Sequence, residues 1–134
     1  MTGRSFLLPA TIAMLALTGC WGDANTYPFS LADMKDRLAD EKLTYYNKDK
    51  AFHLSIKEAH GNSMNVTINS PEAYWMAECV ILLEAVDQAS TRIVPECGTS
   101  DNEYKQESLE AIEDTIAEKA RVILLGEEAA QAAS

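Results

Sequence analysis

Two stretches of apolar and polar alternation, close together in the chain, constrain its fold more than any other feature of the sequence. Three apolar residues alternate with polar ones in each stretch: Phe52, Leu54 and Ile56, then Met64, Val66 and Ile68. Successive side chains of a strand point to opposite faces, so the pattern predicts two strands with one apolar face. Gly61 and Asn62 between them predict the turn of an antiparallel hairpin. Two strands are marginal alone, so another element must cover the apolar face.

The segment after the hairpin is expected to provide that cover as a helix. Ser70, Pro71 and Glu72 have the features of a helix start, because they supply a cap, a proline at the first position and an acid near the positive end. The apolar residues that follow recur at helical spacing and predict a core helix over residues 71–89. Its stripe would comprise Trp75, Cys79, Leu82, Val86 and Ala89. A short third strand is expected over residues 91–94.

Two further helices are expected on either side of this core. Ser30 is a good N-cap for a helix that carries Leu31, Met34 and Leu38 at helical spacing. Residues 43–46 could extend that helix or begin a strand. The longest helix begins at Asp101 or Asn102 and stops at Gly126. Its apolar stripe comprises Leu109, Ile112, Ile116, Ala120 and Ile123. The sequence therefore predicts a small single α+β domain over residues 30–126, followed by a disordered tail at 127–134.

The first twenty residues have a different character from the rest of the chain. Arg4 precedes an almost wholly apolar run over residues 6–17. This run is too short to span a bilayer as a helix, which needs about 20 apolar residues, but it fits the apolar region of a secretory signal. It ends in Leu17, Thr18, Gly19 and Cys20, so small residues precede a cysteine and a leucine lies three positions upstream of it.

This ending resembles the lipobox of a bacterial lipoprotein precursor. The resemblance implies that residues 1–19 are a signal peptide, that the Cys20 sulfur carries a diacylglyceryl group, and that residues 20–29 are a lipidated tether. Two or more acyl chains hold a protein stably on a membrane. An aspartate after the cysteine is the usual signal for retention in the inner membrane. Trp21 occupies that position, so the resemblance implies an outer membrane location facing the periplasm.

Two cysteines remain once Cys20 is assigned to lipid. Cys79 and Cys97 would form a disulfide in the oxidising bacterial envelope. The alternatives are a metal site or a reactive thiol. Two thiolates alone make an incomplete zinc site, and the chain has no Cys-x-x-Cys motif.

Charge excludes some partners and favours others. The chain has 21 acidic and 11 basic residues, which gives a formal net charge of −10 at pH 7. This balance argues against nucleic acid, whose phosphates require clustered Lys and Arg. It also argues against a folded domain lying flat on anionic lipid. A basic protein partner is favoured electrostatically.

Glu78 is the most unusual residue of the expected core helix. At helical spacing its neighbours would include Tyr74, Trp75 and Leu82, all large apolar or aromatic residues. A carboxyl group in such surroundings would have a raised pKa and could grip a ligand, so Glu78, Tyr74 and Trp75 are the candidate pocket residues. The alternative is that Glu78 lies at the edge of the apolar stripe or bonds a tyrosine.

The sequence contains no catalytic, metal-binding or cofactor-binding motif. His53 and His60, the only histidines, have odd spacing and would point to opposite faces of a strand, which disfavours a shared metal. We therefore expect no enzyme and no cofactor. The favoured function is an envelope lipoprotein that binds another protein as an accessory module, a class that includes inhibitors and exclusion factors. The alternative is a periplasmic small-ligand carrier with a pocket near Glu78.

Overall fold

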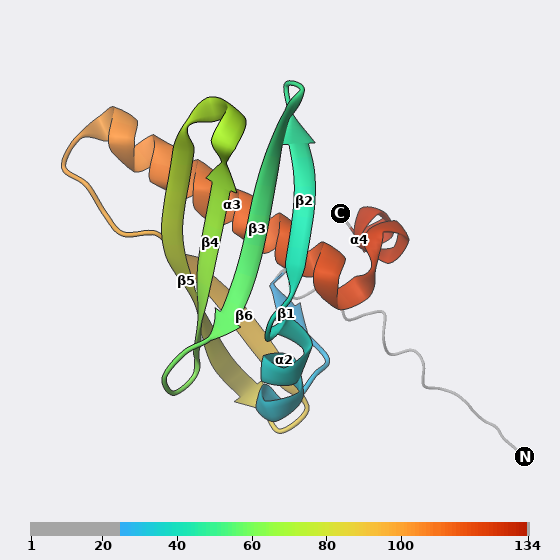
Figure 1. Cartoon of the computed structure of the whole chain (residues 1–134). Coiled ribbons are helices and arrows are strands. Elements are labelled where there is room, and N and C mark those ends of the chain that lie inside the picture. Colours follow the sequence, from blue (N-terminus) through green and yellow to red (C-terminus); the bar gives the residue numbers. More distant parts are fainter. Residues whose placement is uncertain (1–24, 134) are drawn as a thin grey trace, which may run out of the picture.

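The computed structural model describes residues 25–133, in which one antiparallel sheet dominates (Figure 1). The six strands of this sheet follow the order β1-β6-β5-β4-β3-β2, and the sheet curls into a half-barrel. The strands are β1 (Thr26–Tyr27), β2 (Lys42–Asn47), β3 (Lys50–Glu58), β4 (Ser63–Ser70), β5 (Trp75–Asp87) and β6 (Ser90–Glu96). From β2 to β6 each strand pairs with the next strand in the chain, so short turns connect them.

The helices pack on one side of the sheet and at one end of it. They are α2 (Leu31–Leu38), α3 (Glu103–Leu125), α4 (Glu127–Ala133) and a single 3₁₀ turn, η2 (Pro71–Ala73). The Ser30 hydroxyl caps α2 by accepting a hydrogen bond from the Asp33 N–H. The Asn102 side chain caps α3 in the same way, and α3 ends at Gly126. Figure 1 shows α3 crossing behind the sheet.

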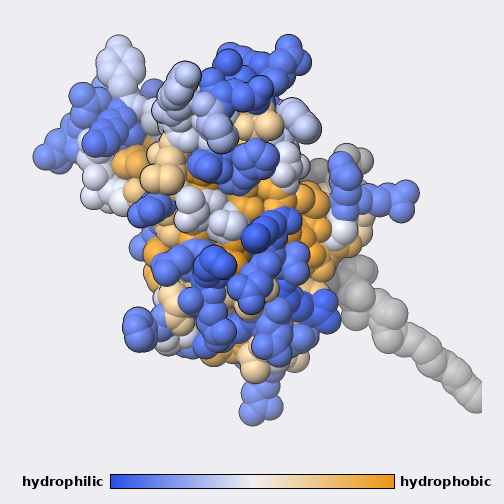
Figure 2. Space-filling view, viewed as in Figure 1, coloured by the Kyte–Doolittle hydropathy of each residue, from blue (hydrophilic) through white to orange (hydrophobic). Residues whose placement is uncertain are grey.

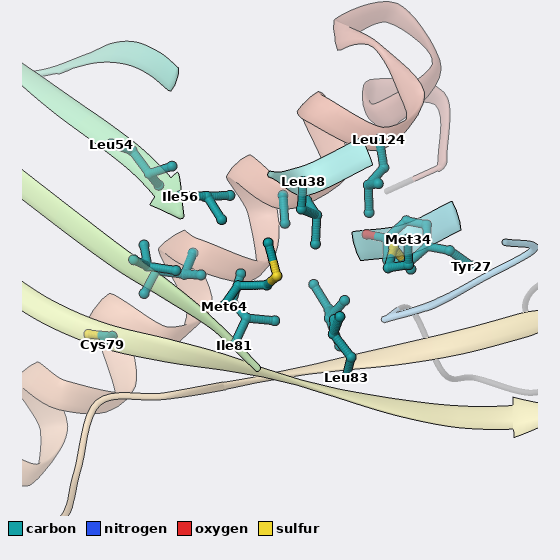
Figure 3. Close-up of a cluster of buried hydrophobic side chains, with 14 of the residues drawn as sticks. Tyr27, Met34, Leu38, Leu54, Ile56, Met64, Cys79, Ile81, Leu83 and Leu124 are labelled. Carbon is teal, nitrogen blue, oxygen red and sulfur yellow. The ribbon is translucent and has the colours of Figure 1, made fainter. Parts of the chain in front are cut away.

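The hydrophobic core lies between the inner face of the half-barrel, α2 and the second half of α3 (Figure 3). Met34 and Leu38 of α2 are both fully buried, and α3 contributes Ile116, Ala120 and Leu124. The sheet contributes every second residue of its central strands, as its period of two requires: Leu54, Ile56, Met64, Val66, Ile68, Cys79, Ile81, Leu83 and Ile93. The outer face carries mainly polar residues, and Figure 2 shows hydrophilic side chains around a smaller hydrophobic area in the same view.

The expected α+β class with one hairpin and a core helix is wrong. The segment expected as a helix over 71–89 forms only the η2 turn, and the chain then becomes the 13-residue strand β5. Tyr74 adopts a left-handed backbone conformation (φ 52°) that ends the turn. Strand β5 pairs with β4 on one side and β6 on the other, and a helix would have left both neighbours without these backbone partners.

Two expected segment boundaries also need correction. Residues 26–29 were expected in the tether, but Thr26 and Tyr27 form β1 against β6, and the Tyr27 side chain is only 3% exposed. The Arg37 guanidinium lies 4.0 Å from the centre of the Phe29 ring. The tail expected to be disordered forms α4 over Glu127–Ala133, where Ala130 is buried. Apolar contacts therefore extend the folded part at both of its ends.

Candidate binding site at the open end of the half-barrel

The two ends of the half-barrel differ in how they are filled. We call the end that holds Tyr27, Met34, Leu38 and Leu124 the closed end, because their buried side chains fill it (Figure 3). The other end, next to η2 and the β2–β3 turn, we call the open end. A cavity of about 370 Å³ lies there between the sheet and α3. Its lining residues are Tyr45, Asn47, Phe52, Ile68, Ala73, Trp75, Ala111, Ile112 and Thr115.

Three aromatic rings form one wall of this cavity. Tyr45 and Phe52 are cross-strand partners on β2 and β3, and their rings stack with centroids 5.4 Å apart and an interplanar angle of 13°. The Trp75 ring meets Phe52 edge to face, with centroids 5.7 Å apart. Both geometries are favourable for aromatic pairs. All three side chains project from the inner face of the sheet, so the curl of the sheet brings them together under α3.

Charged groups lie near the edge of the aromatic wall. The Lys119 Nζ lies 4.7 Å from the centre of the Tyr45 ring, within the range of a cation–π contact. Burial raises the pKa of the Tyr45 hydroxyl, and the negative charge of Glu118 raises it further. Lys119 and Glu118 both belong to α3, so this helix places one positive and one negative charge at the rim of the cavity.

Strand β2 has a free edge beside this end. Within residues 25–133, β2 is the last strand of the sheet and has β3 as its only neighbour. The Ile56 N–H donates to the Glu41 carbonyl. In an antiparallel ladder every second residue turns its backbone groups toward the neighbouring strand, so residues 43, 45 and 47 face β3 in the same way as Glu41. The N–H and C=O groups of Lys42, Thr44 and Tyr46 consequently point away from the sheet.

A disulfide and two hydrogen bonds hold the first half of α3 over the open end. Cys79 of β5 and Cys97, just after β6, form the disulfide, which is the pairing expected from the sequence. The Cys97 N–H donates to the Glu113 carboxylate of α3 at 2.8 Å. The Ser100 N–H donates to the Gln106 side chain of the same helix at 2.7 Å. These contacts fix the connection between the sheet and α3.

Only Trp75 of the three candidate pocket residues lines this cavity. Glu78 is on the outer face of β5 opposite Thr67, in a separate pocket of about 390 Å³ that Asn65, Val80 and Glu96 also line. Its side chain is exposed because β5 is a strand, and the apolar neighbours expected from helical spacing do not surround it. Tyr74 is 95% exposed on η2. Glu78 therefore lines a pocket on the outer face, and Tyr74 and Trp75 do not share it.

No local pattern in the sequence marks Tyr45 and Phe52 as a pair of site residues. Each belongs to a segment that reads as an ordinary strand, and they meet only through the register of the β2–β3 hairpin. The turn between Asn47 and Lys50 sets this register. Cys20, the expected lipid attachment residue, lies outside the described residues, as do the expected signal peptide over residues 1–19 and Trp21.

The part of the chain that the structure describes lacks a membrane-spanning helix and a metal-binding cluster. Among residues 25–133, no helix combines the length and apolar character that crossing a membrane requires. The same residues hold no group of three His, Cys, Asp or Glu side chains placed to share a metal ion. Comparison with known proteins identifies no relative, because no family model, curated protein or solved structure matches this chain.

Proposed function

We propose that this chain is a lipid-anchored protein of the bacterial cell envelope, most favourably placed at the outer membrane facing the periplasm, and that it binds another polypeptide along β2. The lipobox Leu17-Thr18-Gly19-Cys20 supports the anchor. The observation that carries the binding role is the free edge of β2, where Lys42, Thr44 and Tyr46 direct backbone donors and acceptors outward. The role is that of an accessory module rather than of an enzyme.

Strand addition is the mode of recognition that this edge favours. An extended segment can continue a sheet by pairing with exposed backbone groups, and these bonds supply affinity while side chains supply specificity. Proteins commonly protect exposed edges with prolines, bulges or very short strands. Strand β2 has six residues, contains no proline and pairs with β3 in unbroken register. Thr44, Tyr45 and Tyr46 favour extended backbone, which keeps the edge ready for a partner strand.

The position of β1 supports a partner away from the anchoring membrane. Strand β1 pairs with Thr91 and Arg92 of β6, and Arg92 pairs in turn with Glu84 of β5. Trp75 at the open end is nine residues from Glu84 along β5, a distance of about 30 Å in a strand. A tether that enters at β1 leaves the open end directed away from the lipid. A net charge of −10 favours a basic partner.

A pair of substitutions at Thr44 tests the proposal. Thr44→Pro removes an outward N–H, and an edge strand tolerates proline at such a position. Thr44→Val keeps this N–H. Both variants lose the hydrogen bond between the Thr44 hydroxyl and His53 Nδ1. They therefore differ mainly in whether residue 44 keeps its outward N–H group. Capture of the acylated protein from crosslinked native envelopes should recover one near-stoichiometric partner with Thr44→Val and much less of it with Thr44→Pro.

Three controls separate the parts of the proposal. Thermal unfolding of both variants checks that the sheet survives. Cys20→Ala tests the anchor, because this variant should lose both the acyl group and capture of the partner in the envelope. Equal capture with Thr44→Pro and Thr44→Val would contradict strand addition, and absence of any specific partner would contradict the interaction role.

A further inference from the structure

The cavity at the open end has the composition of a small-molecule site. Its volume of about 370 Å³ falls in the range of ligand pockets, which are mostly apolar with a few polar groups. Seven of its nine lining residues are aromatic or aliphatic, and the remaining two are Asn47 and Thr115. The Thr115 hydroxyl already donates to the Ala111 carbonyl at 3.0 Å, so it is left as an acceptor.

The aromatic wall offers flat surfaces for a ring. Tyr45, Phe52 and Trp75 are in continuous contact, and Trp75 remains 36% exposed. A planar ligand can stack on such surfaces, or meet them edge to face, with a gain beyond that of apolar burial. Ile112 and Ala111 of α3 lie on the opposite side of the cavity. The cavity is therefore shaped as a slot between aromatic side chains and a helix.

Ser70 supplies a polar atom close to this wall. Ser70 pairs with Trp75, and the β3–β4 register places it opposite Phe52, so it lies between these two ring-bearing residues on the inner face. Its side chain is 0% exposed, and its Oγ has no hydrogen-bond partner within the described residues. An unpaired buried hydroxyl is costly and is rare in folded proteins. Ser70 is not among the lining residues of the cavity, so a molecule bound there does not reach this hydroxyl.

The charges around the cavity select against an anion. None of the nine lining residues is charged. The carboxylate of Glu118 is close enough to Tyr45 to raise the pKa of its hydroxyl. The nearby cation Lys119 already faces the Tyr45 ring. An anionic ligand would lose its hydration without gaining a counter-charge among the lining residues.

We propose that this cavity binds an uncharged aromatic or alicyclic ring compound that carries one hydrogen-bonding group, with Asn47 and Thr115 as the polar residues of its lining. The ring stacks against Phe52 and Trp75, and α3 closes over it through Ala111 and Ile112. This site is separate from the β2 edge and does not depend on the proposed polypeptide partner. Either role can fail without the other.

Two fluorescent probes with the same ring framework test the proposal. N-phenyl-naphthylamine is uncharged and has an N–H group, whereas anilinonaphthalene sulfonate adds a negative charge. The protein is the whole mature chain from Cys20 to Ser134 with Cys20→Ala, which avoids detergent, and Trp21→Phe, which leaves Trp75 as the only tryptophan. The uncharged probe should bind saturably with energy transfer from Trp75. The sulfonate should bind at least about tenfold more weakly.

Matched variants locate the bound probe. Ala111→Leu adds bulk to the cavity lining, whereas Ala129→Leu makes the same change on the exposed face of α4. Ala111→Leu should weaken binding of the uncharged probe at least about tenfold, and Ala129→Leu should leave it unchanged.

Several results would overturn the inference. Equal affinity for the two probes would show general apolar adsorption rather than a site that excludes anions. Equal effects of Ala111→Leu and Ala129→Leu would place the probe elsewhere. Thermal unfolding of each variant separates loss of the cavity from loss of the fold.

Discussion

The closed and open ends of the half-barrel are built from the same strands, yet they are stabilised in different ways. At the closed end, Met34 and Leu38 of α2 insert fully buried side chains against the sheet. At the open end no helix inserts, and the first half of α3 contributes no fully buried residue. The disulfide fixes the segment that leads into α3, and two hydrogen bonds from backbone N–H groups of that segment to α3 side chains hold this part of the helix instead. Dense packing therefore stabilises the closed end, whereas covalent and hydrogen-bonded links stabilise the open end, which keeps a cavity.

Two isoleucines one turn apart on α3 give the largest test of this difference. Ile116 is 1% exposed in the core, whereas Ile112 lines the cavity and is only partly buried. Ile116→Ala should lower the free energy of unfolding by about 2–5 kcal/mol, because it removes packed atoms and leaves a void. Ile112→Ala should cost about 1 kcal/mol, because the atoms it removes already border open space. Denaturant unfolding measures both values, and equal losses would contradict the distinction between the ends.

The disulfide should matter most for the open end. In the loop-entropy account, removing a cross-link that closes a loop of this length costs about 3 kcal/mol. Cys79→Ala with Cys97→Ala should therefore destabilise the domain by about that amount. Hydrogen exchange should rise first over residues 103–112 of α3, whereas α2 should keep its protection because packing holds it. A uniform rise in exchange over both helices would show that the disulfide does not act locally.

Parts of this fold could be predicted from the sequence because their signals are local. Alternation at 52–56 and 64–68 marked the two strands that pair as β3 and β4. Ser30 marked the start of α2, and Asn102 and Gly126 marked the two ends of α3. Each signal depends on a residue's effect on its own backbone or on the next turn. None depends on which distant segment packs against it.

Strand β5 could not be predicted because its pattern fits two periods. Residues 79–83 are all apolar, and such a run fits a helical stripe as well as a strand that is partly covered on both faces. Ile81 and Leu83 are buried on the inner face, while Val80 and Leu82 are half-buried on the outer face. The pairing of β5 with both β4 and β6 decides between the two periods, and that pairing is a property of the whole sheet.

The candidate site was predicted less well than the fold for the same reason. Trp75 was identified beside Glu78 on an assumed helix, and the strand sends these two side chains to opposite faces. Alternation along β5 explains that separation, because Trp75 and Glu78 are an odd number of residues apart. Tyr45 and Phe52 enter the site through cross-strand register. Sites assembled in this way depend on the sheet being known first.

Tyrosine ionisation gives the smallest and most local test of the two ends. Burial raises the pKa of Tyr27 at the closed end, and Arg121 lowers it part of the way back. Burial also raises the pKa of Tyr45 at the open end, but there Glu118 adds to the rise. Both hydroxyls hold their protons more tightly in the folded state. The stability they contribute is therefore present below pH 10, the ordinary tyrosine value, and is lost as the pH rises through their folded pKa values.

Glu118→Gln should change the pKa of Tyr45 without changing that of Tyr27. Removing the carboxylate should lower the pKa of Tyr45, and by less than burial raises it, because burial is the larger cause. The pKa of Tyr27 should not change, since Glu118 is not among the groups that shift it. Asp114→Asn, one turn earlier on the exposed face of α3, removes the same charge and should leave Tyr45 unaffected. Carbon NMR of the tyrosine rings across alkaline pH measures each pKa. An equal shift at both tyrosines would mean that Glu118 acts through the net charge of the whole domain, whereas a shift confined to Tyr45 would show that the carboxylate acts directly at the rim of the cavity.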